Sequence, residues 1–393
     1  MAKPLRVGLI GSRFMGKAHS NAWMSAGCFF ELPRDIVMST ICARDRKATA
    51  QFAQRWGWTN WTADWRELMD DPAIDLVDVA TPNHVHAEQA VAALEAGKHV
   101  ACEKPLAATL ADARQMRDAA AKAKRRGAMT FVWFNYRRCP AVAFAHQLVR
   151  KGRLGRIFHV RASYLQDWGG PSTPLLWRFD AKQAGSGAHG DLNAHIVDLA
   201  RFLTGEEVVE VAGAIEHTFI KERPLPAGEG TLKGKGARRK GRSTVDDCVI
   251  FLARMGGGAV ASFEATRLAT GNQNRNRIEV NGEKGAFVFD FERMNELLWW
   301  DNTLPSAERG WSRIMCTNGG DHPYADAYWP PAHLLGYEHG FVSEAADIVK
   351  AVAGRKPVCP LPDFEDAYRT QVVLEAAIVS ARERRPVAIK EIG

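Results

Sequence analysis

Residues 5–16 read LRVGLIGSRFMG. A short apolar run ends at Gly11, and a helical pattern begins near Gly16. This order of strand, glycine turn and helix suits dinucleotide binding, because glycines let the backbone come close and helix N-terminal amides bind the pyrophosphate. Arg13 replaces the middle glycine of G-x-G-x-x-G, and its side chain either reaches the pyrophosphate or points to solvent. We predict a cofactor loop of Gly11, Arg13, Phe14, Met15 and Gly16; the alternative is a plain turn in which Gly16 only allows close packing.

Short apolar runs alternate with longer, Ala-rich stretches of helical period over the first third of the chain. Such alternation is typical of parallel strands with crossover helices on both faces of the sheet. We therefore predict an α/β fold in which residues 1–134 form a doubly wound, NAD(P)-binding Rossmann domain. The expected strands are 5–10, 36–42, 74–80, 98–102 and 128–134, and the expected helices are 15–26, 46–56, 84–97 and 109–126.

The remainder of the chain, residues 135–393, has a different pattern. Its expected strands follow one another between glycine-rich turns, such as Gly256-Gly257-Gly258 and Asn281-Gly282, which is typical of an antiparallel meander. We predict an α+β domain with a large, open, mostly antiparallel sheet that binds substrate and mediates oligomerisation. The expected strands are 157–166, 247–252, 259–265, 277–280 and 286–289, and the expected helices are 191–203, 337–353 and 364–382.

The formal net charge of the 393-residue chain is +7. Residues 221–244 hold eight basic and two acidic residues, so they carry six of the seven net positive charges. They also hold seven Gly or Pro and show no buried period, which predicts an exposed basic loop inserted in the second domain. Because the rest of the chain is nearly neutral, we predict no nucleic-acid partner.

The seven cysteines are scattered and form no C-x-x-C pair, which favours a reduced, intracellular compartment. The N-terminus enters an apolar strand at once and leaves no room for a signal peptide. No run approaches about 18 apolar residues, the length needed to cross a membrane. We predict a cytoplasmic protein without a membrane partner.

The acid that usually binds the adenine ribose is expected at the end of the second strand. This strand ends Cys42-Ala43-Arg44-Asp45, so a small residue stands there and Arg44 follows it. An arginine at this point either meets a 2′-phosphate, which favours NADP, or stacks on adenine, which tolerates NAD. We predict NAD as the cofactor and keep NADP as the alternative.

Four motifs in this order resemble the Gfo/Idh/MocA oxidoreductases, a resemblance that covers nearly the whole chain. Within that family, the levoglucosan dehydrogenase-like and inositol dehydrogenase-like members look closest. The motifs are Gly11-x-x-x-Met15-Gly16-x-x-His19, Ala80-Thr81-Pro82-Asn83-x-x-His86, Glu103-Lys104-Pro105-Leu106 and Gly187-x-x-Gly190-Asp191-x-x-x-His195-x-x-Asp198.

The resemblance implies a role for each motif. Thr81, Asn83 and His86 match the loop near the cofactor, and Glu103 matches the residue that holds the nicotinamide ribose. Lys104 matches a residue that serves both cofactor and substrate. The family resemblance further implies a homo-oligomer, most simply a homotetramer or homodimer, and no metal.

Oxidation of a secondary alcohol by nicotinamide requires a base for the hydroxyl proton and a donor to the same oxygen. Lys104 follows a parallel strand at the edge where ligands bind, and a lysine there can donate to the alcohol oxygen. Asp191 and His195 are four residues apart, so one helix face presents both; His195 is the natural base near neutral pH. The alternatives are an exposed loop lysine, and a helix-capping aspartate with an unrelated histidine.

Further pocket candidates lie around the predicted second domain. Sugar faces stack on aromatic rings, while amides, hydroxyls and guanidinium groups read hydroxyl groups. On this basis we assign the substrate site to Tyr136, Gln166, Trp168 and Arg178 with Lys104, Asp191 and His195, and core packing is the alternative for the first four.

These residues together predict an NAD(P)-dependent dehydrogenase that oxidises a secondary hydroxyl of a sugar, an anhydrosugar such as levoglucosan, or a cyclitol. One alternative is a relative that holds NAD tightly and recycles it, as an oxidoreductase or a hydrolytic enzyme. Another is a non-catalytic dinucleotide-binding protein, although a pure binder has no need of Lys104, Asp191 and His195.

Overall fold

A computed structural model describes residues 3–226 and 236–393. The chain divides into two compact units, each built from two segments. Unit 1 comprises residues 1–139 and 317–368, and unit 2 comprises residues 140–316 and 369–393. No described helix has the length and the apolar character that a membrane crossing requires.

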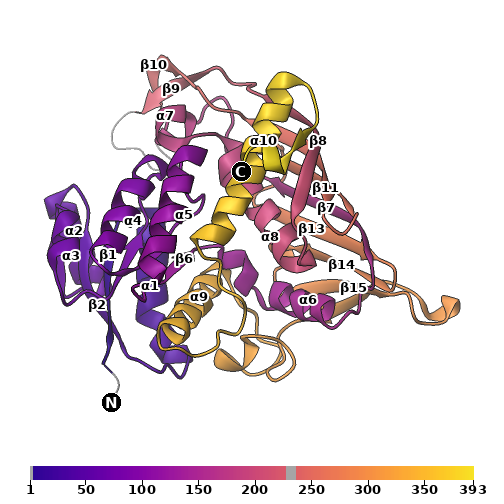
Figure 1. Cartoon of the computed structure of the whole chain (residues 1–393), viewed down its shortest axis with the longest axis horizontal. Helices are drawn as coiled ribbons and strands as arrows, with labels where there is room; N and C mark the ends of the chain where they lie inside the picture. The colour runs from indigo at the N-terminus through magenta and orange to yellow at the C-terminus, as the bar shows by residue number, and fades with distance from the viewer. Residues whose placement is uncertain (1–2, 227–235) are drawn as a thin grey trace. The chain divides into compact units, whose positions relative to one another are not determined.

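The core of unit 1 is a six-stranded sheet in the order β3-β2-β1-β4-β5-β6 (Figure 1). All neighbouring strands are parallel. This order is that of a dinucleotide-binding Rossmann domain, and it confirms the predicted doubly wound architecture. The strands are β1 (Leu5–Ile10), β2 (Ile36–Cys42), β3 (Asn60–Thr62), β4 (Leu76–Val79), β5 (His99–Cys102) and β6 (Thr130–Val132).

Among the crossover helices of unit 1, α1 contacts α2, and α4 and α5 pack side by side (Figure 1). The predicted helices of this unit are confirmed to within three residues at each end. Strand β3 and helix α3 are not predicted, because three and five residues are too few to show a period. The helical segments are α1 (Phe14–Phe29), α2 (Arg46–Trp56), α3 (Arg66–Asp70), η1 (Asn83–Val85), α4 (His86–Glu95), α5 (Leu110–Lys124) and η2 (Asn135–Arg138).

The second segment of unit 1 returns to the first and packs α9 (Tyr337–Val352) along α1. Aromatic contacts line this packing: the rings of Phe14 and Tyr337 stack with centroids 6.1 Å apart, and Phe341 lies 5.7 Å from the imidazole of His19. The segment also contains η7 (Ala325–Ala327) and the start of α10 (Phe364–Glu383).

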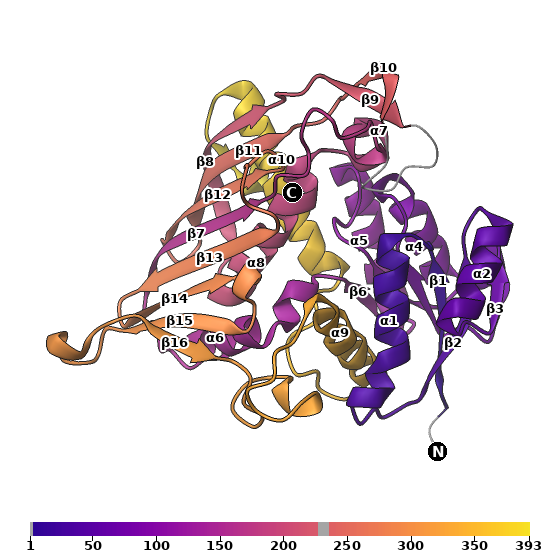
Figure 2. The same cartoon turned by 180° about the vertical axis from the view of Figure 1, so that it is seen from behind.

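The core of unit 2 is a nine-stranded sheet in the order β16-β15-β14-β13-β7-β12-β11-β8-β17 (Figure 2). Neighbouring strands are antiparallel except for β7 and β12, which confirms the predicted, mostly antiparallel sheet. The strands are β7 (Ile157–Leu165), β8 (Val208–His217), β11 (Cys248–Met255), β12 (Val260–Thr266), β13 (Arg275–Gly282), β14 (Gly285–Asp290), β15 (Glu296–Asp301), β16 (Ser312–Met315) and β17 (Val387–Ala388).

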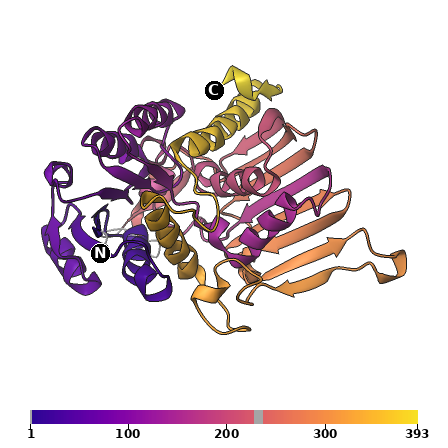
Figure 3. The same ribbon diagram turned by 60° about the horizontal axis from the view of Figure 1, so that its bottom comes forward.

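Helices cover one face of this sheet. The helices α6 (Pro140–Arg150) and α8 (Ala194–Thr204) pack on β7, β13, β14 and β15 (Figure 3). The covered face carries a row of buried side chains that runs across five strands in register: Phe251, Phe263, Ala162, Ile278 and Phe289. The remaining helical segments of the unit are η3 (Trp177–Phe179), α7 (Ala181–Ala184), η4 (His189–Asn193), η5 (Phe291–Arg293), η6 (Ser306–Glu308) and η8 (Ile389–Glu391).

The segment predicted as an exposed basic loop, 221–244, differs from that prediction where it is described. Its ends pair as an antiparallel hairpin of β9 (Glu222–Pro226) and β10 (Gly236–Arg242). Arg223 is fully buried and donates to the carbonyl of Gly169 and to the carboxylate of Asp247, each at 2.9 Å. The contacts of one arginine thus anchor a segment whose composition predicts a loop. Residues 227–235 lie outside the described residues.

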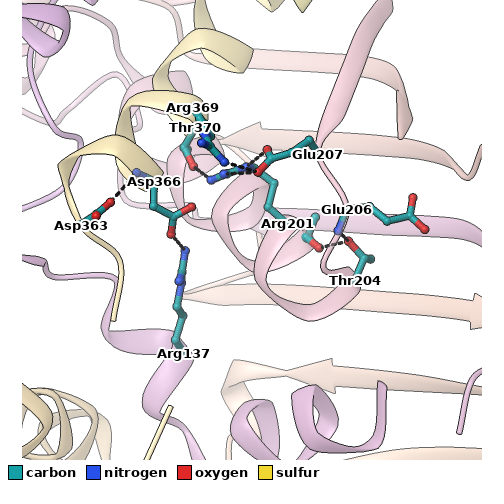
Figure 4. A network of polar contacts seen from close by, with 10 residues as sticks. Arg137, Arg201, Thr204, Glu206, Glu207, Asp363, Asp366, Arg369 and Thr370 are labelled. Atoms are coloured by element: carbon teal, nitrogen blue, oxygen red, sulfur yellow. Dashed lines mark hydrogen bonds and ion pairs between the residues drawn. The ribbon is translucent and has the colours of Figure 1, made fainter. Parts of the chain in front are cut away.

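Ion pairs fix α10 in each unit separately (Figure 4). In unit 1, the Arg137 guanidinium lies 2.7 Å from a carboxylate oxygen of Asp366 in the first turn of the helix. In unit 2, Arg201 donates to Thr370 at 2.8 Å and forms a two-point contact with Glu207, at 2.7 and 2.8 Å. Two-point contacts of this kind fix geometry as well as charge.

Candidate functional site

The glycine loop after β1 forms a cradle of closely spaced backbone, in which a side chain at either Gly11 or Gly16 would clash. Gly11 has φ +117°, and a Cβ added there would collide with the Ala80 carbonyl. A Cβ added at Gly16 would collide with the carbonyl of Gly11. Helix α1 begins beside this turn, so its free N-terminal amides and the open backbone suit a pyrophosphate group.

The other residues of the predicted cofactor loop are accessible. Arg13 precedes α1 and is exposed, and its side chain makes no capping bond to the helix. Phe14 is 51% exposed and Met15 is half-buried. Arg44 is exposed directly after β2, where the adenine ribose of a dinucleotide lies in such folds.

The loop after β4 is fixed by hydrogen bonds with buried side chains of the helix that follows it. Thr81 donates its hydroxyl to the side-chain oxygen of Gln89 at 2.8 Å, and Asn83 begins η1 in a half-buried position. His86 is completely buried; its Nε2 lies 2.9 Å from the Thr81 carbonyl and its Nδ1 lies 3.2 Å from that of Pro105. Burial lowers the pKa of His86. His86 therefore shapes the two loops that follow β4 and β5.

Glu103 and Lys104 follow β5. Glu103 is 4% exposed, and its Oε2 accepts the backbone amide of Lys104 at 3.0 Å. Lys104 is half-buried. The carboxyl end of a parallel strand is the edge at which such sheets bind ligands, so Lys104 lies where the sequence predicts it.

A buried polar network lies behind this turn. Nδ1 of His19 is 3.0 Å from Asp78, and Nε2 of the same ring is 3.0 Å from Oε1 of Glu103. The indoles of Trp23 and Trp133 donate to the two oxygens of Asp78 at 2.7 and 2.9 Å. Burial alone would lower the pKa of His19, but the two carboxylates outweigh it and raise the pKa to about 10. The two carboxylates thus favour the protonated form of His19.

In unit 2, the predicted catalytic residue Asp191 lies on a helical turn of unusual pitch, and His195 lies in the first turn of the α-helix that follows. The prediction of one α-helix over 191–203 is wrong at its start: Asp191 lies in the π-helical turn η4, and α8 begins at Ala194. The carboxylate of Asp246 accepts the backbone amides of Gly187 and His189, at 2.7 and 2.8 Å, and so fixes the approach to this turn. Single π turns are frequent at functional sites.

Asp191 has a partner that the sequence does not reveal. Its carboxylate lies 2.6 Å from Nη2 of Arg267, a residue only 2% exposed directly after β12. The same guanidinium lies 5.0 Å from the ring of Trp168, within the range of a cation–π contact. Asp191 remains about 29% exposed. The contact with Arg267 orients the Asp191 carboxylate while solvent still reaches it.

The other catalytic candidate of unit 2, His195, is 5% exposed, and its imidazole lies 5.8 Å from the ring of Tyr164. Gln166 links Trp168 to the strand beyond: it accepts the indole N–H at 2.6 Å and donates to Asn274 at 2.8 Å. The hydroxyl of Tyr164 donates to the same Asn274 oxygen at 2.8 Å. The structure therefore joins Gln166 and Trp168 in one network.

The structure places the other two predicted substrate residues on short 3₁₀-helical turns. Tyr136 is buried in η2 of unit 1, at 3% exposure. Arg178 is half-buried and stacks over the ring of Trp177 at 4.5 Å. Their assignment to a substrate site stays a prediction.

Among the described residues, no group of three or more His, Cys, Asp or Glu is arranged to hold a metal ion. His189, two residues before Asp191 in the chain, is buried with both ring nitrogens engaged. Its Nε2 lies 2.9 Å from the Leu374 carbonyl, and its Nδ1 lies 2.9 Å from the side chain of Asn193. His189 is a structural residue of unit 2.

Comparison with known proteins agrees with these features. Residues 5–131 match the family model for the NAD-binding Rossmann fold of an oxidoreductase family, and residues 142–288 match the GFO/IDH/MocA C-terminal domain. A levoglucosan dehydrogenase of Pseudarthrobacter phenanthrenivorans is 43% identical over 99% of both chains.

Two solved structures are similar over the full length. An oxidoreductase domain protein from Kribbella flavida has a TM-score of 0.93 and 48% identity, covering 99% of this chain and all of that one. A levoglucosan dehydrogenase in complex with NADH and levoglucosan has a TM-score of 0.90 and 41% identity, with coverage of 99% and 100%.

The charge state of His19 predicts how stability depends on pH. A pKa raised from 6.5 to about 10 stabilises the fold fully below the unfolded-state value, and this contribution is lost as the pH rises towards the folded-state value. We expect the difference in unfolding free energy between wild type and His19→Gln to be largest near pH ~6 and to shrink steadily up to pH ~10. Urea denaturation at a series of pH values measures it.

Trp58→Phe is the matched control. Trp58 is buried and donates to Ser20 on α1 at 3.0 Å, so its loss also weakens α1 but removes no titrating group. The difference for this variant should stay constant over the same pH range. If the His19→Gln difference were equally constant, His19 would be neutral in the folded protein.

Proposed function

This chain belongs to the Gfo/Idh/MocA family of oxidoreductases, and we propose that it is an NAD-dependent dehydrogenase for a secondary hydroxyl of a sugar, anhydrosugar or cyclitol. Levoglucosan is the first substrate to test. The observation that carries this proposal is the similarity to a levoglucosan dehydrogenase along nearly the whole of both chains. The glycine cradle and the Lys104 turn supply matching chemistry for the cofactor and the alcohol.

NAD, when bound, accepts a hydride from the carbon that carries the hydroxyl. In the proposed reaction, Lys104 donates a hydrogen bond to the alcohol oxygen and stabilises the negative charge that develops there. His195 takes the hydroxyl proton as the general base. The alcohol thus loses one hydride and one proton, and a ketone leaves.

The pairing of Asp191 with Arg267 assigns that carboxylate an orienting role. A carboxylate held by a buried guanidinium is fixed in direction, and its remaining lone pairs accept hydrogen bonds from sugar hydroxyls. Trp168 and Gln166, linked to each other, offer an aromatic face and an amide, which suit the apolar and polar sides of a sugar ring.

The catalytic assignment predicts the effect of two substitutions. Lys104→Ala and His195→Ala should each lower kcat by about 10²-fold or more, the usual size of an acid–base contribution. Initial rates of NAD reduction with levoglucosan and with a panel of sugars and cyclitols measure it. Lys151→Ala, at an exposed position, should leave turnover unchanged. Wild type that reduces NAD with no member of the panel would disprove the proposed function, and unchanged rates in both variants would disprove the roles.

The orienting role of Asp191 predicts a second set of effects. Arg267→Met removes a charge-assisted hydrogen bond worth roughly 1.5–3 kcal/mol, so kcat/KM for the sugar should fall by about 10- to 150-fold. Arg267→Lys keeps the positive charge but lacks the forked donors of a guanidinium, so kcat/KM should fall less in this variant. The affinity for NADH should not change in either variant.

Arg275→Met is the control for this set, because Arg275 pairs with Asp290 at a position 43% exposed. It should leave kcat/KM within about 2-fold of wild type, since exposed ion pairs contribute little. Equal losses in Arg267→Met and Arg275→Met would show that Arg267 has no special relation to the substrate.

The uncovered face of the unit 2 sheet supports self-association of this chain. Ile250, Leu252 and Val260 are 39%, 57% and 47% exposed on that face, and Ile215 beside Ile250 is 67% exposed. Exposed apolar patches of this kind usually mark an interface. Arg254 and Glu210 pair with each other on the same face, so its charges are already balanced beside the apolar side chains. We propose that it forms a homodimer interface, from which a tetramer can also be built.

The double variant Ile250→Asp/Leu252→Asp should dissociate this assembly, because it places buried charges at the centre of an apolar interface. Sedimentation velocity of wild type and variant measures the change in mass. Val358→Asp, at an apolar unit 1 position of similar exposure (41%), should keep the wild-type mass. A monomeric wild type would disprove the interface.

A further inference from the structure

Glu103 is fixed at both of its carboxylate oxygens. Oε1 lies 3.0 Å from Nε2 of His19, and Oε2 accepts the backbone amide of Lys104 at 3.0 Å. One oxygen is thus bound by helix α1 and the other by the turn that carries Lys104. A carboxylate bound at both ends has little freedom to rotate, so the position of the turn depends on the position of the helix.

The imidazole that holds Glu103 is itself held on every side. Its Nδ1 lies 3.0 Å from Asp78 in β4, at the opposite end of the ring from Glu103. Its face lies 4.3 Å from the ring of Trp133 and 5.7 Å from that of Phe341, centroid to centroid. His19 and Asp78 are both completely buried. Packing therefore fixes the orientation of the His19 ring, and with it the direction of the bond to Glu103.

We propose that His19 is a positioning residue that, anchored on Asp78, sets the Glu103 carboxylate and through it the backbone of Lys104. This inference rests on the proposed function, in which Glu103 and Lys104 serve the cofactor and the alcohol. It links two parts of the cofactor site, because His19 lies one turn beyond the glycine cradle at the N-terminus of α1. The helix whose N-terminus is proposed to bind the pyrophosphate, α1, thereby also positions Glu103 and Lys104 after β5.

Two isosteric substitutions separate the two bonds of His19. The amide of asparagine overlies the Nδ1 edge of imidazole, so His19→Asn keeps a donor for Asp78 and loses the bond to Glu103. The amide of glutamine overlies the Nε2 edge, so His19→Gln keeps the bond to Glu103 and loses that to Asp78. We expect kcat to fall by about 10-fold or more in His19→Asn, the effect of one charge-assisted bond, and by clearly less in His19→Gln.

A double-mutant cycle with Glu103→Gln tests whether His19 acts through Glu103. If it does, His19→Asn should lower kcat by no more than about 2-fold in the Glu103→Gln background, because the bond is already changed there. Trp58→Phe, which weakens α1 without touching this network, should have the same small effect in both backgrounds. Independent, multiplying effects of His19→Asn and Glu103→Gln would overturn the proposal, as would equal losses in the Asn and Gln variants.

The same cycle is measured on the dissociation constant of NADH, which requires no substrate. Absence of turnover with every sugar would end the proposed function but leave this readout intact. His19→Asn should then weaken NADH binding by about 10-fold in the wild-type background and by no more than about 2-fold with Glu103→Gln. Unchanged NADH binding in His19→Asn, together with unchanged kcat where turnover exists, would show that the network is structural alone.

Discussion

A carboxylate in the middle of the central parallel sheet constrains unit 1. Asp78 is completely buried in β4, and an isolated charge there would cost far more free energy than a domain has to spare. The imidazole of His19 and two indole N–H groups satisfy it. These donors come from α1 and from the residue after β6. All the hydrogen bonds of the carboxylate therefore form only when α1 is packed on the sheet and β6 has taken its position at the edge. The same contacts reach Glu103, so folding and the geometry of the site depend on one network.

The sequence predicts best the strands whose side chains are mostly buried. β1 and β2 are mostly buried and mostly apolar, as expected for strands inside a parallel sheet, and their predicted bounds match the structure. β8 is not predicted, because its sequence VVEVAGAIEH leaves Ile215 exposed and so lacks a clean alternation. The sequence does not predict the hairpin of β9 and β10 for another reason. Its composition is that of a loop, and a single buried arginine, Arg223, supplies the anchor that composition cannot show.

The same distinction applies to the site. The turns that carry Gly11, Gly16 and Lys104 can be predicted because each depends on its near neighbours in the sequence, while the roles of these residues stay predictions. Arg267 cannot, since its partner Asp191 is 76 residues away and nothing local marks it. Asp78 is an intermediate case: an acid within the apolar run LVDV signals that a buried partner must exist, but the sequence does not say which residue it is. Local patterns reveal which groups need a partner, and tertiary structure decides which groups meet.

The two-segment construction of unit 1 has a consequence for the order of synthesis. Helix α1 and the sheet leave the ribosome early, whereas α9, which packs on α1, follows only after residues 140–316. At roughly 5–20 residues per second this interval lasts on the order of ten to thirty seconds. Throughout it, the nascent Rossmann sheet exposes the apolar side of α1 that Tyr337 and Phe341 later cover. This side of α1 therefore stays without its final packing partner until the C-terminal part of the chain has been made.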